Sequence, residues 1–185
     1  MRAGRAIAIV MLSVALAGCG GEPRGGEGSL PGPVPSGVSY EAADPSSPPA
    51  PGFSLELVDG TPITGAELWE RRAVVLAFFA SWCTTCAEQQ ADLTALAERY
   101  GDSVAFLGIA GEDEPEALAA YLDEHEVAYA VALDDDLAVW RSYAVREPPQ
   151  VVVIAKGGRV VRGWPGGASR ALIVETLDSL VTRGG

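Results

Sequence analysis

Two hydrophobic patterns alternate along residues 53–185. One consists of short, nearly unbroken runs of Val, Ile, Leu, Phe and Ala, which are typical of strands buried on both faces of a sheet. Such runs predict strands over 73–80, 104–110 and 151–155. In the other pattern, apolar residues recur three and four positions apart, as on the buried face of a helix. This spacing predicts helices over 87–100 and from an N-cap at Ser169 to Val181.

Weaker signals fill the gaps between these elements. Pro115 is favoured at a first helical position and predicts a helix over 115–124. Alternating apolar and polar residues predict a half-buried strand over 53–57. The remaining elements are a short strand at 129–133, a short helix at 137–143, and a hairpin turn at Gly157-Gly158 that leads into 159–162. This order of strands and helices predicts an α/β fold whose sheet is covered by helices on both faces.

The first nineteen residues have the pattern of an export signal. Arg2 and Arg5 precede an apolar run from Ala6 to Ala17, which is shorter than the roughly 20 residues that span a bilayer and fits a signal-peptide core. Leu16-Ala17-Gly18-Cys19 then resembles the lipobox of bacterial lipoproteins. The resemblance implies that residues 1–18 are cleaved off and that Cys19 is lipidated. An ordinary secretory signal with an incidental cysteine is the alternative.

The segment after Cys19 has the composition of a spacer. Of the 33 residues from Gly20 to Gly52, 21 are Gly, Pro or Ser, so few side chains can bury apolar area to offset the entropy of ordering. We therefore predict a flexible tether over 19–52 that holds one domain, residues 53–185, away from the membrane.

The overall charge excludes one class of partner. The 185 residues carry a formal net charge of −12, whereas nucleic-acid binding requires a basic surface that neutralises phosphates. The hydrophobic content of 48% is typical of a globular domain with a buried core. We expect no nucleic-acid partner.

A cysteine pair, Cys83 and Cys86, stands where the strand over 73–80 gives way to the next helix. At a helix N-terminus, free N–H groups and the positive end of the helix dipole stabilise a thiolate on the first sulfur. Because the thiolate is the nucleophile of thiol–disulfide exchange, Cys83 is expected to attack a partner disulfide and Cys86 to resolve the mixed disulfide. Trp82 is expected to pack over the disulfide and limit access to it, with a plain core position as the alternative.

Other uses of the pair fit the sequence less well. A structural disulfide that closes so short a loop stabilises a fold little. A zinc site needs four ligands, and His125 is the only histidine. Thioredoxin-like copper chaperones resemble Cys-x-x-x-Cys instead, and the peroxiredoxin pattern Pro-x-x-x-Thr-x-x-Cys matches the residues before neither Cys83 nor Cys86. We therefore expect no metal and no cofactor.

Two segments together resemble the TlpA/ResA-type branch of the thioredoxin-like superfamily. One is Trp82-Cys83-Thr84-Thr85-Cys86 after an apolar strand. The other runs from Tyr143 through Pro148-Pro149 to Ile154, and is similar to the Tyr-Gly-Val-x-Gly-x-Pro-Thr-x-x-x-Ile segment of that family. The resemblance extends from Phe53 almost to the C-terminus. It implies a thioredoxin-like fold with a central mixed β-sheet, in which Pro149 is cis and packs against the cysteines.

The chain departs from that family pattern around the second cysteine. Gln89 and Ala91 stand where family members often carry Glu and Pro, and Ala77 occupies the position of the buried acid of thioredoxin. No obvious proton acceptor for Cys86 remains. Pro148 has no N–H to give to a substrate strand, which predicts altered peptide binding.

The resemblance implies an exported, membrane-tethered thiol–disulfide oxidoreductase. The leading hypothesis is a reductant that receives electrons from a membrane partner and reduces protein disulfides, such as those of apocytochrome c. An oxidant that introduces disulfides and a non-catalytic binding module are the alternatives. We expect an extracytoplasmic monomer, anchored to the cell membrane by the lipid on Cys19.

Overall fold

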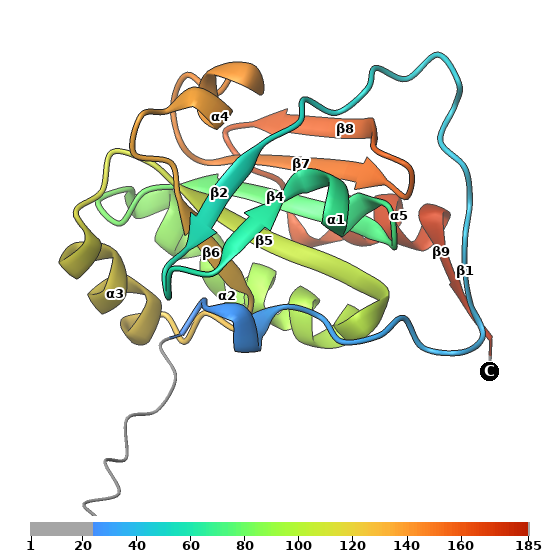
Figure 1. Cartoon of the computed structure of the whole chain (residues 1–185), viewed down its shortest axis with the longest axis horizontal. Helices are drawn as coiled ribbons and strands as arrows, with labels where there is room; N and C mark the ends of the chain where they lie inside the picture. Colours follow the sequence, from blue (N-terminus) through green and yellow to red (C-terminus); the bar gives the residue numbers. More distant parts are fainter. Residues whose placement is uncertain (1–23, 185) are drawn as a thin grey trace, which may run out of the picture.

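A computed structural model describes residues 24–184. Its main feature is a seven-stranded mixed sheet with the strand order β3-β2-β6-β5-β4-β7-β8 (Figure 1). The central strands β4, β5 and β6 are parallel, and the other neighbours pair antiparallel. The strands are β2 (Ser54–Leu57), β3 (Pro62–Thr64), β4 (Ala73–Phe79), β5 (Val104–Ala110), β6 (Ala130–Leu133), β7 (Gln150–Ala155) and β8 (Arg159–Pro165).

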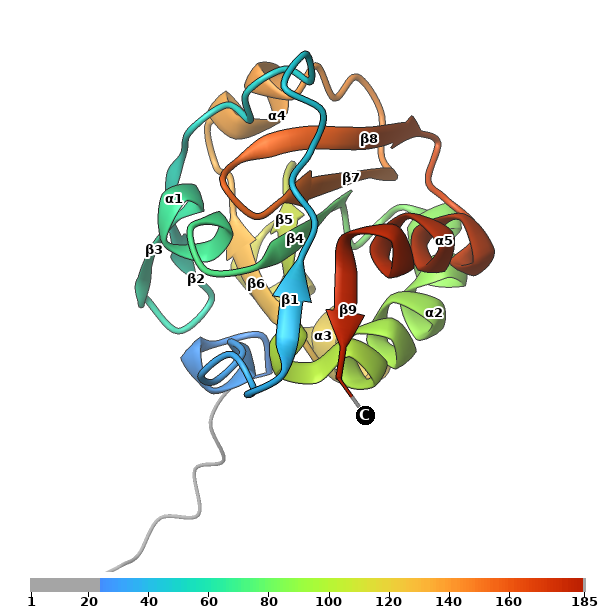
Figure 2. The ribbon, with the colours of Figure 1, turned by 90° about the vertical axis from the view of Figure 1, so that its right-hand side faces the viewer.

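Helices cover both faces of this sheet, as the sequence predicts (Figure 2). The helices are α1 (Gly65–Trp69), α2 (Thr84–Tyr100), α3 (Pro115–Glu124), α4 (Ala138–Ser142) and α5 (Arg170–Leu180), with short 3-10 helices η1 (Glu27–Ser29) and η2 (Gly101–Ser103). Helices α2, α3 and α5 share one buried cluster, whereas α1 and α4 pack into the cluster on the opposite face. Among the described residues, no helix is both long enough and apolar enough to cross a bilayer.

The burial of β4 on both faces of the sheet explains why the apolar run over 73–80 contains no polar residues. Its residues alternate between the two faces, so that Ala73, Val75 and Ala77 enter one cluster, while Val74, Leu76 and Phe78 enter the other. None of these six side chains is more than 4% exposed. The strand therefore forms the rigid centre of the domain, and the cysteine pair follows directly at its C-terminal end.

The prediction of a flexible tether is wrong for residues 24–52. This segment, which we call the N-terminal strap, lies along the domain, and its strand β1 (Val38–Tyr40) pairs antiparallel with the C-terminal strand β9 (Val181–Arg183). Figure 2 shows the two strands side by side. Backbone hydrogen bonds also join the strap to β6 at Gly25, to β8 at Pro48, and to the turn before β8 at Ala50. Main-chain groups, which composition does not report, supply most of these contacts.

One buried arginine contacts the strap directly. The Arg72 residue is only 4% exposed, and its guanidinium donates to the carbonyl oxygens of Gly32 in the strap, at 2.7 Å, and of Asp102. Burial lowers the pKa of this guanidinium from its usual value. The Gly32 N–H in turn donates to Asp102 Oδ1 at 2.7 Å. Arg72 thus ties the strap to the turn between α2 and β5.

Besides the 3-10 helices η1 and η2, four short elements of the described residues were not predicted from the hydrophobic pattern: β1, β3, α1 and β9. Helix α1 nevertheless carries a local signal, because Thr64 and Glu67 form a capping box. The Glu67 N–H donates to Thr64 Oγ1 at 3.3 Å, and the Thr64 N–H donates to Glu67 Oε2 at 2.9 Å. The sequence Thr-x-x-Glu is a recognised helix start, so α1 was predictable from capping rather than from periodicity.

Candidate functional site

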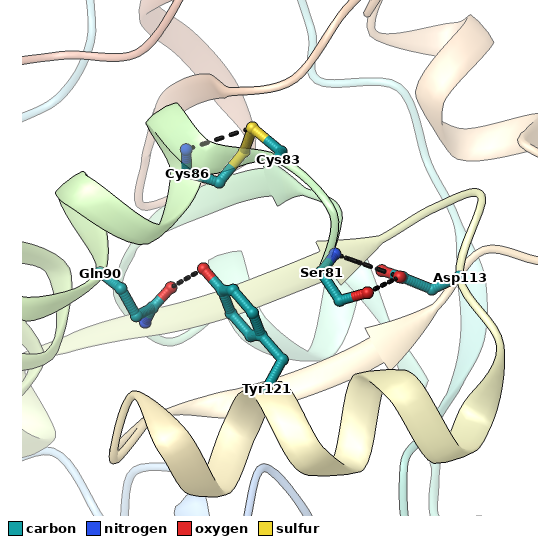
Figure 3. Close-up of a disulfide and its surroundings, with 6 residues drawn as sticks. All are labelled: Ser81, Cys83, Cys86, Gln90, Asp113 and Tyr121. Carbon is teal, nitrogen blue, oxygen red and sulfur yellow. Dashed lines mark hydrogen bonds between the residues drawn. A yellow bond between two sulfur atoms is a disulfide. The ribbon is translucent and has the colours of Figure 1, made fainter.

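The cysteine pair forms a disulfide at the start of α2. The Cys83–Cys86 bond is 2.08 Å long, and the two Cα atoms lie 5.2 Å apart. Cys83 is the N-cap residue of α2, and its sulfur accepts a hydrogen bond of 3.1 Å from the Cys86 N–H (Figure 3). The helix begins at Thr84, three residues before the predicted start at 87. Cys86 therefore lies within its first turn, where N–H groups and the helix dipole favour negative charge on Cys83.

Pro149 lies next to the pair, immediately before β7. The Pro148–Pro149 peptide bond is cis, the isomer expected from the sequence. Because Gln150 of β7 pairs with Phe78 of β4, Pro149 is brought to the end of the sheet where the cysteines lie. Pro149 and Cys86 line the same small cavity.

Trp82 is not a core residue. It is 58% exposed, which is unusual for so large an apolar side chain. Its indole Nε1–H donates at 3.0 Å to the carbonyl oxygen of Glu112, which belongs to the loop between β5 and α3. The tryptophan therefore presents most of its surface to solvent beside the disulfide.

A second contact between the same two loops was missed from the sequence. The carboxylate of Asp113 accepts hydrogen bonds from the Ser81 N–H, at 2.9 and 3.1 Å, and from the Ser81 hydroxyl (Figure 3). Asp113 belongs to an acidic run just before α3, and such a run indicates only favourable negative charge at a helix N-terminus. Nothing in the local pattern connects it with a residue 32 positions earlier.

A buried polar cluster lies beneath the first turns of α2. Gln90 is 1% exposed, and its amide Nε2 donates to Tyr129 Oη at 2.7 Å, while the Tyr121 hydroxyl donates to Gln90 Oε1 at 3.5 Å. Burial raises the pKa of Tyr121 to about 12, so its hydroxyl stays protonated at neutral pH. Tyr121 also stacks on Phe79 of β4 at 5.4 Å between ring centroids. This cluster fixes α3 against the helix that carries the cysteines.

A small cavity lies beside Cys86. It has a volume of about 10 Å³, close to the space that one water molecule needs. Ala77, Cys86, Gln89 and Pro149 are among its lining residues, and none of the described lining residues is acidic. Gln89 Oε1 is buried without a hydrogen-bond partner among the described residues. Gln89 and Cys86 thus line the same cavity, and the Gln89 side chain carries an acceptor without a partner among the described residues.

Comparison with known proteins identifies the family. The model of the AhpC/TSA family matches residues 47–162, which is more than half of the chain. The chain belongs to the AhpC/TSA family. One relative is the thiol-disulfide oxidoreductase ResA of Halalkalibacterium halodurans, to which this chain is 25% identical over 127 residues. The match covers 68% of this chain and 72% of ResA. The thiol:disulfide interchange protein HelX of Rhodobacter capsulatus is 25% identical over 134 residues, covering 71% and 74%.

Solved structures agree with these relatives. A thioredoxin-family thiol:disulfide interchange protein from Chlorobium tepidum superposes on the AhpC/TSA protein with a TM-score of 0.64 at 27% identity, covering 73% of this chain and 99% of that one. An exposed lipoprotein thioredoxin, Etrx1, from Streptococcus pneumoniae gives 0.63 at 26% identity, covering 70% and 100%. The AhpC/TSA protein is therefore a TlpA/ResA-type thiol–disulfide oxidoreductase with a thioredoxin-like fold, as the sequence motifs imply.

Proposed function

We propose that this oxidoreductase reduces disulfides of exported proteins, with Cys83 as the nucleophile and Cys86 as the resolving cysteine. The observation that supports this assignment is the position of the Cys83 sulfur, which caps α2 and accepts the Cys86 N–H. In the reduced protein the same position would favour a Cys83 thiolate, the reactive form in exchange. Trp82 and Pro149 flank the pair and are proposed to contact the substrate.

The reaction proceeds in two balanced steps. The Cys83 thiolate attacks one sulfur of the substrate disulfide, a mixed disulfide forms, and the other substrate sulfur leaves as a thiolate that takes up a proton. The Cys86 thiol then loses its proton and attacks the Cys83 sulfur, which releases the second substrate thiolate and closes the Cys83–Cys86 disulfide. Two electrons have passed to the substrate, and a dithiol partner must return them.

The proton of Cys86 is proposed to leave through a water molecule in the adjoining cavity. Gln89 would accept a hydrogen bond from that water, because the residue lines the cavity and its Oε1 has no partner among the described residues. The glutamine orients the water but cannot itself take up the proton. The resolving step is then limited by how easily water removes the proton, since no carboxylate lines the described cavity.

Placing an acid at this position should therefore change the pH dependence of resolution. We expect Gln89→Glu to accelerate the second step about a hundredfold at neutral pH, the lower end of typical general-base contributions. Burial should raise the pKa of the new carboxyl above its usual value, so the gain should diminish as that group is protonated at lower pH. Quenched-flow measurement of the disappearance of the mixed disulfide gives the rate of this second step.

Gln89→Leu serves as the matched control, because it fills similar space without titrating. It should show no new pH dependence and a rate no higher than that of the wild-type protein. Equal pH profiles for the Glu and Leu variants would show that position 89 has no access to the proton of Cys86.

The equilibrium reduction potential against glutathione tests the direction of electron flow. A value near −270 mV, that of thioredoxin, supports a reductant, whereas a value near −120 mV, that of a strong oxidant, would make disulfide formation the function. No cationic residue lies between Cys83 and Cys86 to stabilise the thiolate further, which favours the reducing direction. Apocytochrome c is proposed as one substrate on the family resemblance, with a membrane protein as electron donor.

An extracytoplasmic location is consistent with the lipoprotein thioredoxin Etrx1 among the structural relatives. Residues 1–18 and Cys19 lie outside the described residues, and their roles as signal peptide and lipid site remain our proposal. Only the five residues Cys19–Pro23 would then separate the lipid from Arg24, the first described residue. Five extended residues reach at most about 18 Å, so the domain would lie close to the membrane. Mass spectrometry of the mature protein from membranes tests the lipidation, and an unmodified Cys19 would exclude it.

A further inference from the structure

The two residues that lead into the disulfide, Ser81 and Trp82, are held by two consecutive residues of another loop. Glu112 accepts the indole N–H of Trp82 through its carbonyl oxygen, and Asp113 accepts both the N–H and the hydroxyl of Ser81 through its carboxylate. Ser81 lies two residues before Cys83. The loop between β5 and α3 thus contacts the residues just before Cys83 in two ways, through the side chain of Asp113 and through the main chain of Glu112.

Packing fixes the position of this second loop. The N–H of Gly111 donates to the carbonyl oxygen of Phe79 at 3.2 Å, which ties the loop to the end of β4. A Cβ atom at Gly111 would lie 2.6 Å from the Trp140 side chain and 2.8 Å from Leu137, so α4 closes over the loop. Glu112 has a left-handed backbone, with φ of 57°. The turn therefore directs Asp113 toward Ser81 within a rigid frame.

Asp113 differs from the other charged residues near the pair. The elements around the disulfide carry Glu88 on α2, Glu112, Asp113 and Glu114 between β5 and α3, and Arg146 and Glu147 before Pro149. Among the described residues, Asp113 alone of these six forms a side-chain hydrogen bond to the loop that leads into Cys83. It is also partly buried, whereas its neighbours Glu112 and Glu114 are exposed. Solvent screens its charge less than theirs.

We propose that Asp113 is a positioning residue that is held beside the active-site loop by its hydrogen bonds to Ser81 and sets the redox reactivity of Cys83 through its charge. Its hydrogen bonds hold the loop so that the Cys83 sulfur caps α2, and its negative charge disfavours a thiolate nearby. The reduced form carries that thiolate and the disulfide does not, so the charge shifts the equilibrium toward the disulfide. Asp113 thereby makes the pair a stronger reductant. The inference rests on the proposed function, because it assumes that Cys83 is the exchanging thiol.

The test compares the exchange equilibrium with glutathione across matched variants. Asp113→Asn keeps an acceptor oxygen for Ser81 and removes the charge. We expect its equilibrium constant to move about fivefold toward the reduced form, which is a rise of about 20 mV at 29.6 mV per tenfold change. Glu114→Gln, which removes an exposed charge from the same loop, should change the constant less than twofold. Ser81→Ala, which removes one hydrogen bond and retains the carboxylate, should also change it less than twofold.

The outcomes separate the two proposals. If Asp113→Asn and Glu114→Gln shift the constant equally, or if Asp113→Asn lowers the potential, the role of Asp113 is overturned. If the wild-type pair does not exchange with glutathione at all, the proposed function fails instead. Should the Asn variant not fold, Asp113→Ser lacks the charge, keeps a hydroxyl acceptor and carries the same expectation. Asp113→Glu retains the charge and should leave the constant within twofold of wild type.

Discussion

Replacing Cys83 with Ser should abolish disulfide reduction, with a fall in kcat/KM of at least about a thousandfold. A serine hydroxyl remains protonated at neutral pH even at a helix N-terminus, whereas a thiol there ionises readily. The replacement is nearly isosteric at a position that is 7% exposed, so the fold should persist. Insulin reduction with a dithiol donor measures the loss, and thermal unfolding checks that the variant is folded.

Cys86→Ser is the matched control for this loss. It retains the nucleophile and removes only the resolving thiol, so it should accumulate a mixed disulfide with its substrate while turnover stops. Cys83→Ser should form no such adduct through Cys86, because Cys86 is a residue only 3% exposed, within the first turn of α2. Adduct formation by Cys83→Ser at the rate of Cys86→Ser would mean that the roles of the two cysteines are reversed.

The second large effect is expected on stability. Arg72→Ala should lower the free energy of unfolding by about 2–4 kcal/mol, because two carbonyl oxygens lose a charged hydrogen-bond donor in a buried site. These oxygens belong to Gly32 and Asp102, so the strap should also separate more often from the turn after α2. Urea unfolding followed by tryptophan fluorescence measures the stability. Limited proteolysis should show faster cleavage within residues 24–52.

Arg71 provides the neighbouring control. Its side chain is exposed, and Arg71→Ala should change the free energy of unfolding by less than about 0.5 kcal/mol. If the two alanine variants are equally stable and equally resistant to protease, Arg72 does not hold the strap. The strap would then depend on β1–β9 pairing and on the backbone bonds to β6 and β8.

Local sequence patterns were sufficient for the central sheet and for the cysteine pair. The run over 73–80 corresponds to β4 at Ala73–Phe79, and 104–110 corresponds to β5 without change. Both strands are buried on two faces, so their sequences have no polar alternation to obscure the pattern. Two cysteines three apart after such a strand also restrict the chemistry strongly. The family resemblance then added the fold and Pro149, whose cis bond the structure contains.

Predictions from composition failed where main-chain groups make the contacts. The Gly, Pro and Ser content of the strap correctly indicates that its side chains bury little apolar area. It carries no information about the N–H and C=O groups that pair with β9, β8 and Val131. Every residue has these groups except that proline lacks the N–H, so whether they meet partners depends on what the rest of the chain places beside them.

The sequence by itself determined that a buried strand is followed by a helix headed by Cys83, because hydrophobic periodicity and cysteine spacing are local properties. Tertiary structure alone decided that Asp113 reaches Ser81, that Gln89 borders the cavity beside Cys86, and that Arg72 binds the strap. Each of these contacts joins residues from different elements, and their geometry depends on how the sheet stacks its strands and helices. Local patterns fix which elements form, whereas the packing of those elements fixes which polar groups meet.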